Sequence, residues 1–108
     1  MRRKDHPIDR LYKTIVSRRK ADPAKSYTAR LLKKGIVQCA KKLGEESVEA
    51  ALAAAVKNRR ALKEESADVL YHLLVVWAAA GVKPKDVYAT LARREGQSGL
   101  AEKASRST

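Results

Sequence analysis

Apolar residues recur at intervals of three and four along most of this chain, which is the spacing of one face of an α-helix. The first such segment covers about Pro7–Lys20, and the proline at its start suits a helix because its missing N–H has no partner there anyway. Residues 21–23, which include a second proline, interrupt the pattern. Ser26 or Thr28 then caps a short helix or turn that meets Gly35. The N-terminal third is therefore predicted to be helical.

Two longer helices and a final shorter one follow. The pattern predicts a long helix over about Ile36–Lys57, whose apolar side chains form one stripe. Asn58 separates it from a helix over about Arg59–Ala80, with Gly81 as the C-terminal cap. Lys83-Pro84 opens a last amphipathic helix. With no β pattern and no repeat, the chain is predicted to be an all-α bundle of four to five helices.

The domain boundaries follow from composition. We expect one all-α domain over residues 7–94, preceded by a flexible basic N-terminus at residues 1–6. The segment after Arg94 contains two glycines and several serines and threonines, so residues 95–108 are expected to be a flexible tail. A chain of 108 residues has room for one modest core.

The helix predicted from Arg59 is unusual, because almost every side chain after Asp68 is apolar. A helix that is apolar all round is buried all round. One small domain hardly supplies so much cover, so we expect a homodimer or larger homo-oligomer to bury part of it. The nearly apolar run at residues 69–81 is too short to span a bilayer, which needs about 20 residues. No membrane association is predicted.

Composition and charge narrow the class without deciding the function. The basic start is followed by Asp5, His6 and Asp9 rather than an apolar core, so we predict no export signal and a cytoplasmic protein. The only cysteine, Cys39, excludes an internal disulfide and is interpreted as a packing residue. The net charge of +12 is compatible with nucleic acid, a phosphorylated small molecule, or solubility alone.

Against this basic background the carboxylates are concentrated on the two long helices. Six of the twelve acidic residues lie within one 24-residue window: Glu45, Glu46 and Glu49 on one helix, and Glu64, Glu65 and Asp68 on the next. Antiparallel neighbours would bring the two sets together. The alternative is a solvated face, since the first set lies opposite the apolar stripe of its helix. The repeated spacing and the position of Asp68 beside an apolar run favour a binding site.

The residue types indicate which metal such a site would take. Carboxylate oxygens suit magnesium, manganese or calcium rather than zinc. A di-iron bundle normally carries Glu-x-x-His on two helices, whereas His72 is the only nearby histidine. Mg²⁺ with a phosphate-bearing substrate therefore fits best. A lone histidine beside an apolar stripe is more often structural, although His72 is placed to orient Asp68 or reach a substrate.

The acidic pattern EESVE at Glu45–Glu49 followed by ESAD at Glu65–Asp68 resembles the EExxE…ExxD signature of the all-α NTP pyrophosphohydrolases, the MazG-like superfamily. Within it, the chain is similar to the phosphoribosyl-ATP pyrophosphatase family over about Ile8–Arg94. Four segments carry this closer resemblance: Ser26–Gly35, Lys41–Ala50, Glu64–Trp77 and Gly81–Arg94. Their ordered combination is far more specific than any one segment.

The resemblance implies an enzyme that hydrolyses phosphoribosyl-ATP to phosphoribosyl-AMP and pyrophosphate in histidine biosynthesis. It implies that Mg²⁺ is held by Glu46, Glu49, Glu65 and Asp68, with Glu45 either a fifth ligand or a base. The substrate carries two anionic ends, which need Lys or Arg partners. The candidates for substrate binding are Lys42 first, then Lys41 and Arg94, with Ser26, Tyr27 and His72. The alternative for each lysine or arginine is that it only keeps the surface soluble, and helix capping alone is enough to explain the presence of Ser26.

Two rival functions remain at this stage. A house-cleaning nucleoside triphosphate pyrophosphatase would use the same metal site with a different base pocket. A basic helical nucleic-acid-binding protein would explain the charge, but its acidic clusters would repel phosphates. We therefore expect a small-molecule substrate and no nucleic-acid partner.

Overall fold

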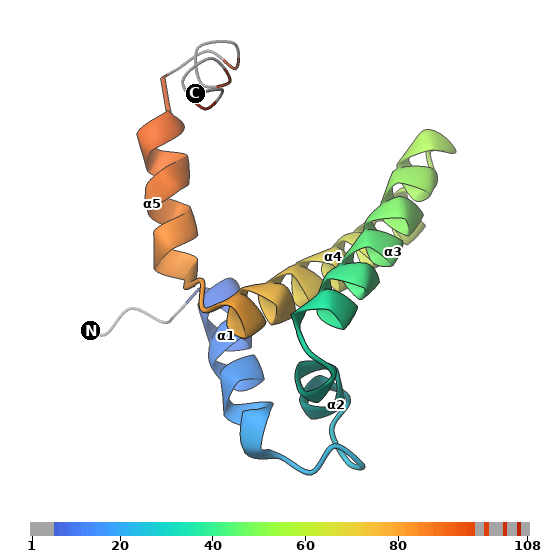
Figure 1. Ribbon diagram of the computed structural model, residues 1–108. Helices are drawn as coiled ribbons and strands as arrows, with labels where there is room; N and C mark the ends of the chain where they lie inside the picture. The colour runs from blue at the N-terminus through green and yellow to red at the C-terminus, as the bar shows by residue number, and fades with distance from the viewer. Residues whose placement is uncertain (1–5, 97–98, 100–102, 104–105, 107–108) are drawn as a thin grey trace, which may run out of the picture.

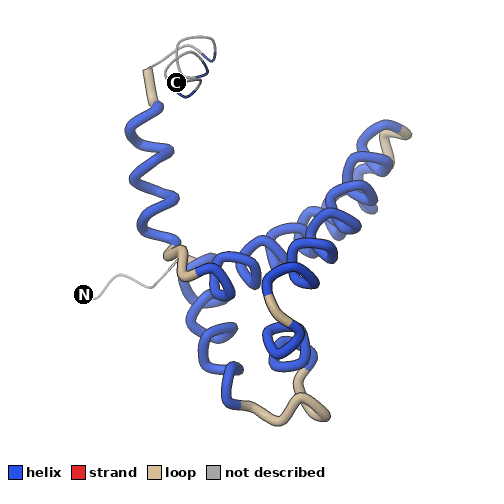
Figure 2. The backbone as a smooth tube through the Cα atoms, in the orientation of Figure 1, coloured by secondary structure: helices blue, strands red, loops and turns tan. Residues whose placement is uncertain are grey.

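The computed structural model describes residues 6–96 together with residues 99, 103 and 106. Within this part of the chain there are only helices and connecting turns, as Figure 2 shows. The elements in order are α1 (Pro7–Ser17), the short 3₁₀ helix η1 (Arg18–Lys20), α2 (Tyr27–Lys34), α3 (Ile36–Ala55), α4 (Arg59–Ala80) and α5 (Pro84–Arg94). The predicted all-α class is confirmed. Most of the two predicted flexible ends lies outside the described residues.

The caps of the short N-terminal helices agree with local sequence chemistry. Of the two predicted caps for α2, Ser26 is the one used, and its hydroxyl accepts a hydrogen bond from the Ala29 N–H at 3.1 Å. Gly35 then has φ 97°, a conformation that side-chain-bearing residues rarely adopt, and it joins α2 directly to α3. The first helix ends at Ser17 as an α-helix and continues as η1, because tight 3₁₀ turns commonly finish a helix.

The hairpin of α3 and α4 is the main structural unit, and Figure 1 shows the two long helices side by side. Lys57 takes φ 59° between them, which ends α3 two residues before the predicted boundary. The Asn58 side chain accepts a hydrogen bond from the Ala61 N–H at 3.0 Å and caps α4. At the other end Gly81 has the predicted left-handed conformation. This connection places the two helices antiparallel.

The hydrophobic core lies where α1, α2, α3 and α4 meet. Its fully buried members are Ile15, Leu31, Cys39, Leu74, Val75 and Ala78. The Cys39 thiol donates to the Leu31 carbonyl oxygen at 3.3 Å, and burial raises the pKa of Cys39 above its ordinary value. Cys39 is thus a packing residue, as predicted. The core fixes the base of the α3–α4 hairpin.

Helix α3 carries more exposed large apolar side chains than α4 does. The apolar run of α4 after Asp68 is buried in part by the core of this chain, although Leu70 stays 43% exposed, so burial of the rest by a second copy stays a prediction. The apolar stripe of α3 instead faces outward, with Val37 81% and Leu52 61% exposed. Val48 is also exposed, as is Val56 at the C-cap directly after α3. We call these four residues the outer face of α3.

Helix α5 extends away from the hairpin on the opposite side of the molecule (Figure 1). It is tied mainly to α1, where the Tyr88 hydroxyl donates to Asp9 Oδ1 at 3.0 Å. The Tyr12 hydroxyl also donates to the Val82 carbonyl oxygen at 2.9 Å, at the turn before α5. The radius of gyration is 16.1 Å. A compact domain of this length is expected at about 13 Å, so the chain is extended. Among the described residues, no single helix is long and apolar enough to cross a membrane.

Candidate active site

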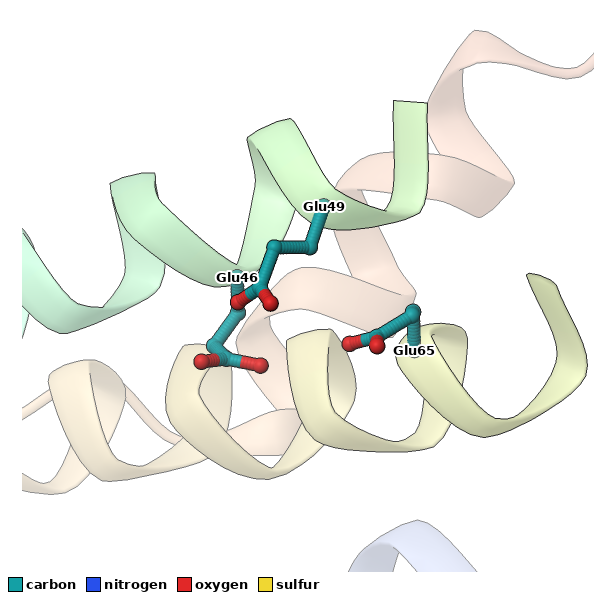
Figure 3. A group of neighbouring side chains, drawn as sticks. All are labelled: Glu46, Glu49 and Glu65. Atoms are coloured by element: carbon teal, nitrogen blue, oxygen red, sulfur yellow. The ribbon is translucent and has the colours of Figure 1, made fainter. Parts of the chain in front are cut away.

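Three carboxylates converge between the two long helices. One side-chain oxygen from each of Glu46, Glu49 and Glu65 lies within 4.8 Å of the other two. Figure 3 shows the side chains of Glu46 and Glu49 pointing from α3 toward α4, with the Glu65 carboxylate directed toward them. The antiparallel hairpin produces this meeting, because it brings the middle of α3 against the first half of α4. Glu46 and Glu65 are partly buried at this meeting point, which a purely solvated face does not explain, whereas Glu49 is exposed.

Burial and the mutual repulsion of the carboxylates raise the pKa values of two members of the cluster. Burial raises the pKa of Glu46, and the charge and hydrogen bond of Glu49 raise it further. Burial also raises the pKa of Glu65, followed by the charges of Glu49, Asp68 and Glu64. A raised carboxyl pKa means that the anionic form is disfavoured by its surroundings. A cation placed among these oxygens would relieve that repulsion, so the residues present fit a divalent metal.

The other predicted acidic residues border the cluster. Asp68 is outside the three-oxygen group, but its charge contributes to the raised pKa of both Glu46 and Glu65. Glu45 turns elsewhere and forms an ion pair with Lys42, with 3.4 Å between the Lys42 Nζ and the carboxylate oxygen. Glu64 is exposed and lies 4.0 Å from the Arg60 side chain. The structure thus separates three converging carboxylates from three flanking ones.

Lys42 and His72 lie beside the carboxylates. The hydrogen bond to Glu45 raises the pKa of Lys42, and the neighbouring Tyr27 and Glu46 add to the effect. His72 is buried with 6% of its surface exposed, and burial lowers its pKa below 6.5. The positive charge of Lys42 lowers it further, against weaker opposing effects from Asp68 and Glu45. His72 is therefore neutral at pH 7.

The N-terminus of α2 brings aromatic side chains to the same region. The Tyr27 ring lies 6.2 Å from the His72 ring and 6.4 Å from that of Tyr71, centre to centre. Tyr71 is a neighbour that the sequence analysis missed. Its hydroxyl is hydrogen-bonded to the Thr28 hydroxyl. The sequence could have indicated Tyr71, because it lies one helical turn after Asp68 on α4 and so shares a face with it.

The remaining candidates lie farther from the cluster or serve a structural purpose. Lys41 is exposed on α3. Arg94 is the last residue of α5, which leads away from the α3–α4 hairpin (Figure 1), so the single chain does not bring it to the carboxylates. Ser26 caps α2 as described above. A substrate contact by any of these three stays a prediction.

Comparison with known proteins matches this arrangement to one family. The family model of phosphoribosyl-ATP pyrophosphohydrolase matches residues 8–95, which is most of the chain. The chain belongs to this family. The predicted family resemblance is confirmed, and so is the expectation of a hydrolase. The matched family is neither that of general NTP pyrophosphatases nor that of nucleic-acid-binding proteins.

Relatives from three bacteria carry the same name, phosphoribosyl-ATP pyrophosphatase. The relative from Granulibacter bethesdensis is 54% identical over 92% of this chain, and the match spans only 62% of that relative's length. The relative from Parvibaculum lavamentivorans is 54% identical over 92% of this chain and 91% of its own length. The relative from Roseobacter denitrificans is 56% identical, with 92% and 94% covered.

Proposed function

We propose that this protein hydrolyses phosphoribosyl-ATP to phosphoribosyl-AMP and pyrophosphate with Mg²⁺, as the second step of histidine biosynthesis in the cytoplasm. The observation that carries the proposal is the convergence of Glu46, Glu49 and Glu65 within 4.8 Å in a chain of this family. The names of the relatives at 54–56% identity support the substrate.

Glu46, Glu49 and Glu65 are the residues that would hold the metal, with Asp68 as the fourth ligand. All four offer only oxygen, which is the donor that Mg²⁺ prefers. When bound, Mg²⁺ would neutralise the phosphate charges and lower the pKa of a coordinated water. The mutual repulsion of the carboxylates favours occupation by a cation.

Glu45 and Lys42 are not among the four proposed metal ligands, so they are candidates for accepting a proton and for binding a substrate phosphate. Because Glu45 is not one of the converging carboxylates, it stays uncommitted to the metal and is our candidate for the base that accepts a proton from the attacking water. Lys42 forms an ion pair with Glu45 and also offers a cation to a substrate phosphate. Because Lys42 is half-exposed, it can leave Glu45 when a phosphate arrives.

The test is a pyrophosphate-release assay of phosphoribosyl-ATP, ATP and a deoxynucleoside triphosphate, with and without Mg²⁺. We expect turnover of phosphoribosyl-ATP that requires the metal, and much slower release from the two ordinary nucleotides. Glu49→Gln and Asp68→Asn should abolish turnover without loss of helical circular dichroism, because each removes a ligand and no core volume. Equal turnover of all three nucleotides would instead support the house-cleaning activity.

The assembly is proposed to be a homodimer in which the outer face of α3 is covered by a second copy. Four branched apolar side chains on one helix face are exposed in the single chain, and contiguous apolar patches of this kind commonly mark protein interfaces. The extended shape of the chain supports the same proposal, since a second copy would fill the space that one chain leaves open.

A further inference from the structure

Three rings form an aromatic group where α2 meets α4. The Tyr27 and Tyr71 rings are nearly parallel, with an angle of 23° between their planes. The His72 ring stands edge-on to both, 4.9 Å from Tyr71. Tyr71 is held in place by its hydrogen bond to Thr28, and His72 is covered by its neighbours. Tyr27 is the outermost ring, with 47% of its surface exposed.

This aromatic group adjoins the carboxylate cluster. Along α4, His72 follows Asp68 by one turn and Glu65 by two, so Glu65 and His72 are about 10 Å apart along the helix axis. Lys42 on α3 forms an ion pair with Glu45 at 3.4 Å, and both Glu46 and Tyr27 are near enough to influence its pKa. A cation thus lies near both the carboxylates and the exposed ring of Tyr27.

His72 contributes a polar atom that the protein itself does not use. Its Nδ1 is buried and has no hydrogen-bond partner among the described residues. Buried polar groups in folded proteins are nearly always paired, because leaving one unpaired costs free energy. A neutral imidazole offers one donor and one acceptor, so it can pair with a neutral polar group of a ligand without a counter-ion.

We propose that Tyr27, Lys42 and His72 form the subsite for the nucleoside part of the substrate. The purine ring stacks on the exposed face of Tyr27, Lys42 meets the phosphate nearest the ribose, and His72 hydrogen-bonds to the base. An exposed ring beside a cation takes a planar, phosphate-bearing ligand, because stacking and charge pairing act at its two ends. This subsite rests on the proposed function, since it assumes that the phosphates lie at the carboxylates.

Replacing Tyr27 separates base recognition from phosphate recognition. In Tyr27→Leu we expect the KM for phosphoribosyl-ATP to rise roughly tenfold, as loss of one stacking partner implies. The inhibition constant of inorganic tripolyphosphate, which has no base, should stay within about twofold of the wild-type value, because its whole length lies at the carboxylates and Lys42. Tyr27→Phe keeps the ring and should restore the wild-type KM. A parallel rise in both constants, or an unchanged KM in Tyr27→Leu, would overturn the subsite.

His72→Leu tests the hydrogen bond at nearly constant volume. It should raise the KM for phosphoribosyl-ATP several-fold with the melting temperature and the tripolyphosphate constant retained. Tyr88→Leu on α5 makes the same change as Tyr27→Leu away from the site and should alter neither constant. An unchanged KM in His72→Leu would remove His72 from the subsite. If the wild type does not hydrolyse phosphoribosyl-ATP, the proposed function fails, while calorimetric binding of ATP against tripolyphosphate still tests Tyr27.

Discussion

Glu46 lies on the half-buried side of α3, where a carboxylate is unfavourable unless something compensates it. The spacing of acidic residues in the sequence located this group, and the residue types indicated an oxygen-only site. The spacing did not show which carboxylates converge. Only the packing of α3 on α4 separates Glu46, Glu49 and Glu65 from Glu45, which turns to Lys42. Side-chain direction between two helices is a tertiary property.

The raised pKa of Glu65 has a consequence for stability that can be measured without substrate. A carboxyl whose pKa is higher in the folded protein than in the unfolded chain binds more protons when folded, so stability falls as pH rises from its ordinary value of 4.5 through the raised value. In metal-free protein, Glu65→Gln removes this penalty and should raise the melting temperature at pH 7. The gain should shrink as pH falls toward 4.5.

The measurement is a melting curve of wild type and Glu65→Gln at several pH values, with and without Mg²⁺. Comparing the two proteins at each pH cancels the opposite effect of His72, whose lowered pKa makes the protein less stable in acid. Saturating Mg²⁺ should stabilise the wild type more than the variant, because a ligand that binds only the folded state raises stability. Equal stabilisation of both would argue against Glu65 as a ligand.

At the scale of elements, the helix boundaries were predicted closely because they depend on local chemistry. Caps such as Ser26 and Asn58 and the left-handed glycine at position 81 act within one turn of their own helix. The orientation of α3 was not predictable in the same way. The sequence showed an apolar stripe without showing what it faces, and the structure turns it outward so that the acidic side meets α4. A stripe that faces a partner has the same periodicity as one that faces a core.

Asn58 is the N-cap residue of α4 and lies in the connection between α3 and α4. Asn58→Ala removes the acceptor for the Ala61 N–H and should lower stability by about 1 kcal/mol. The melting temperature should fall by roughly 4–8 °C for a domain of this size. Asn58→Asp keeps a capping oxygen and should retain most of the stability. If both variants melt like the wild type, the cap does not contribute to holding the hairpin.

At the scale of the whole molecule, two features stand out: the exposed apolar face of α3, and helix α5, which extends away from the α3–α4 hairpin. The sequence predicted that the apolar surface of α4 would exceed what one domain can cover. The packing of α1 and α2 buries much of α4, and α3 exposes more large apolar side chains because it has no helix on its outer side (Figure 1). Which helix has its apolar side chains buried depends on how all five helices pack together.

Leu52→Glu tests whether a second copy covers the outer face of α3. A charge at this exposed position costs a monomer little but should be strongly unfavourable inside an apolar interface. We expect light scattering after size exclusion to show a dimer for the wild type and a monomer for the variant. Ala24→Glu, in the exposed loop before α2, is the matched control and should remain dimeric. A monomeric wild type would contradict the proposed assembly.

The sequence alone determined the helical class, the positions of most caps and the presence of paired acidic clusters, because periodicity, capping and spacing are local properties. Its resemblance to one family also named the chemistry. Only the tertiary structure decided which three carboxylates meet, that Tyr27 and Tyr71 join His72 beside them, and that the apolar stripe of α3 faces outward. These features depend on how separate helices rotate and dock, and no single stretch of sequence specifies that.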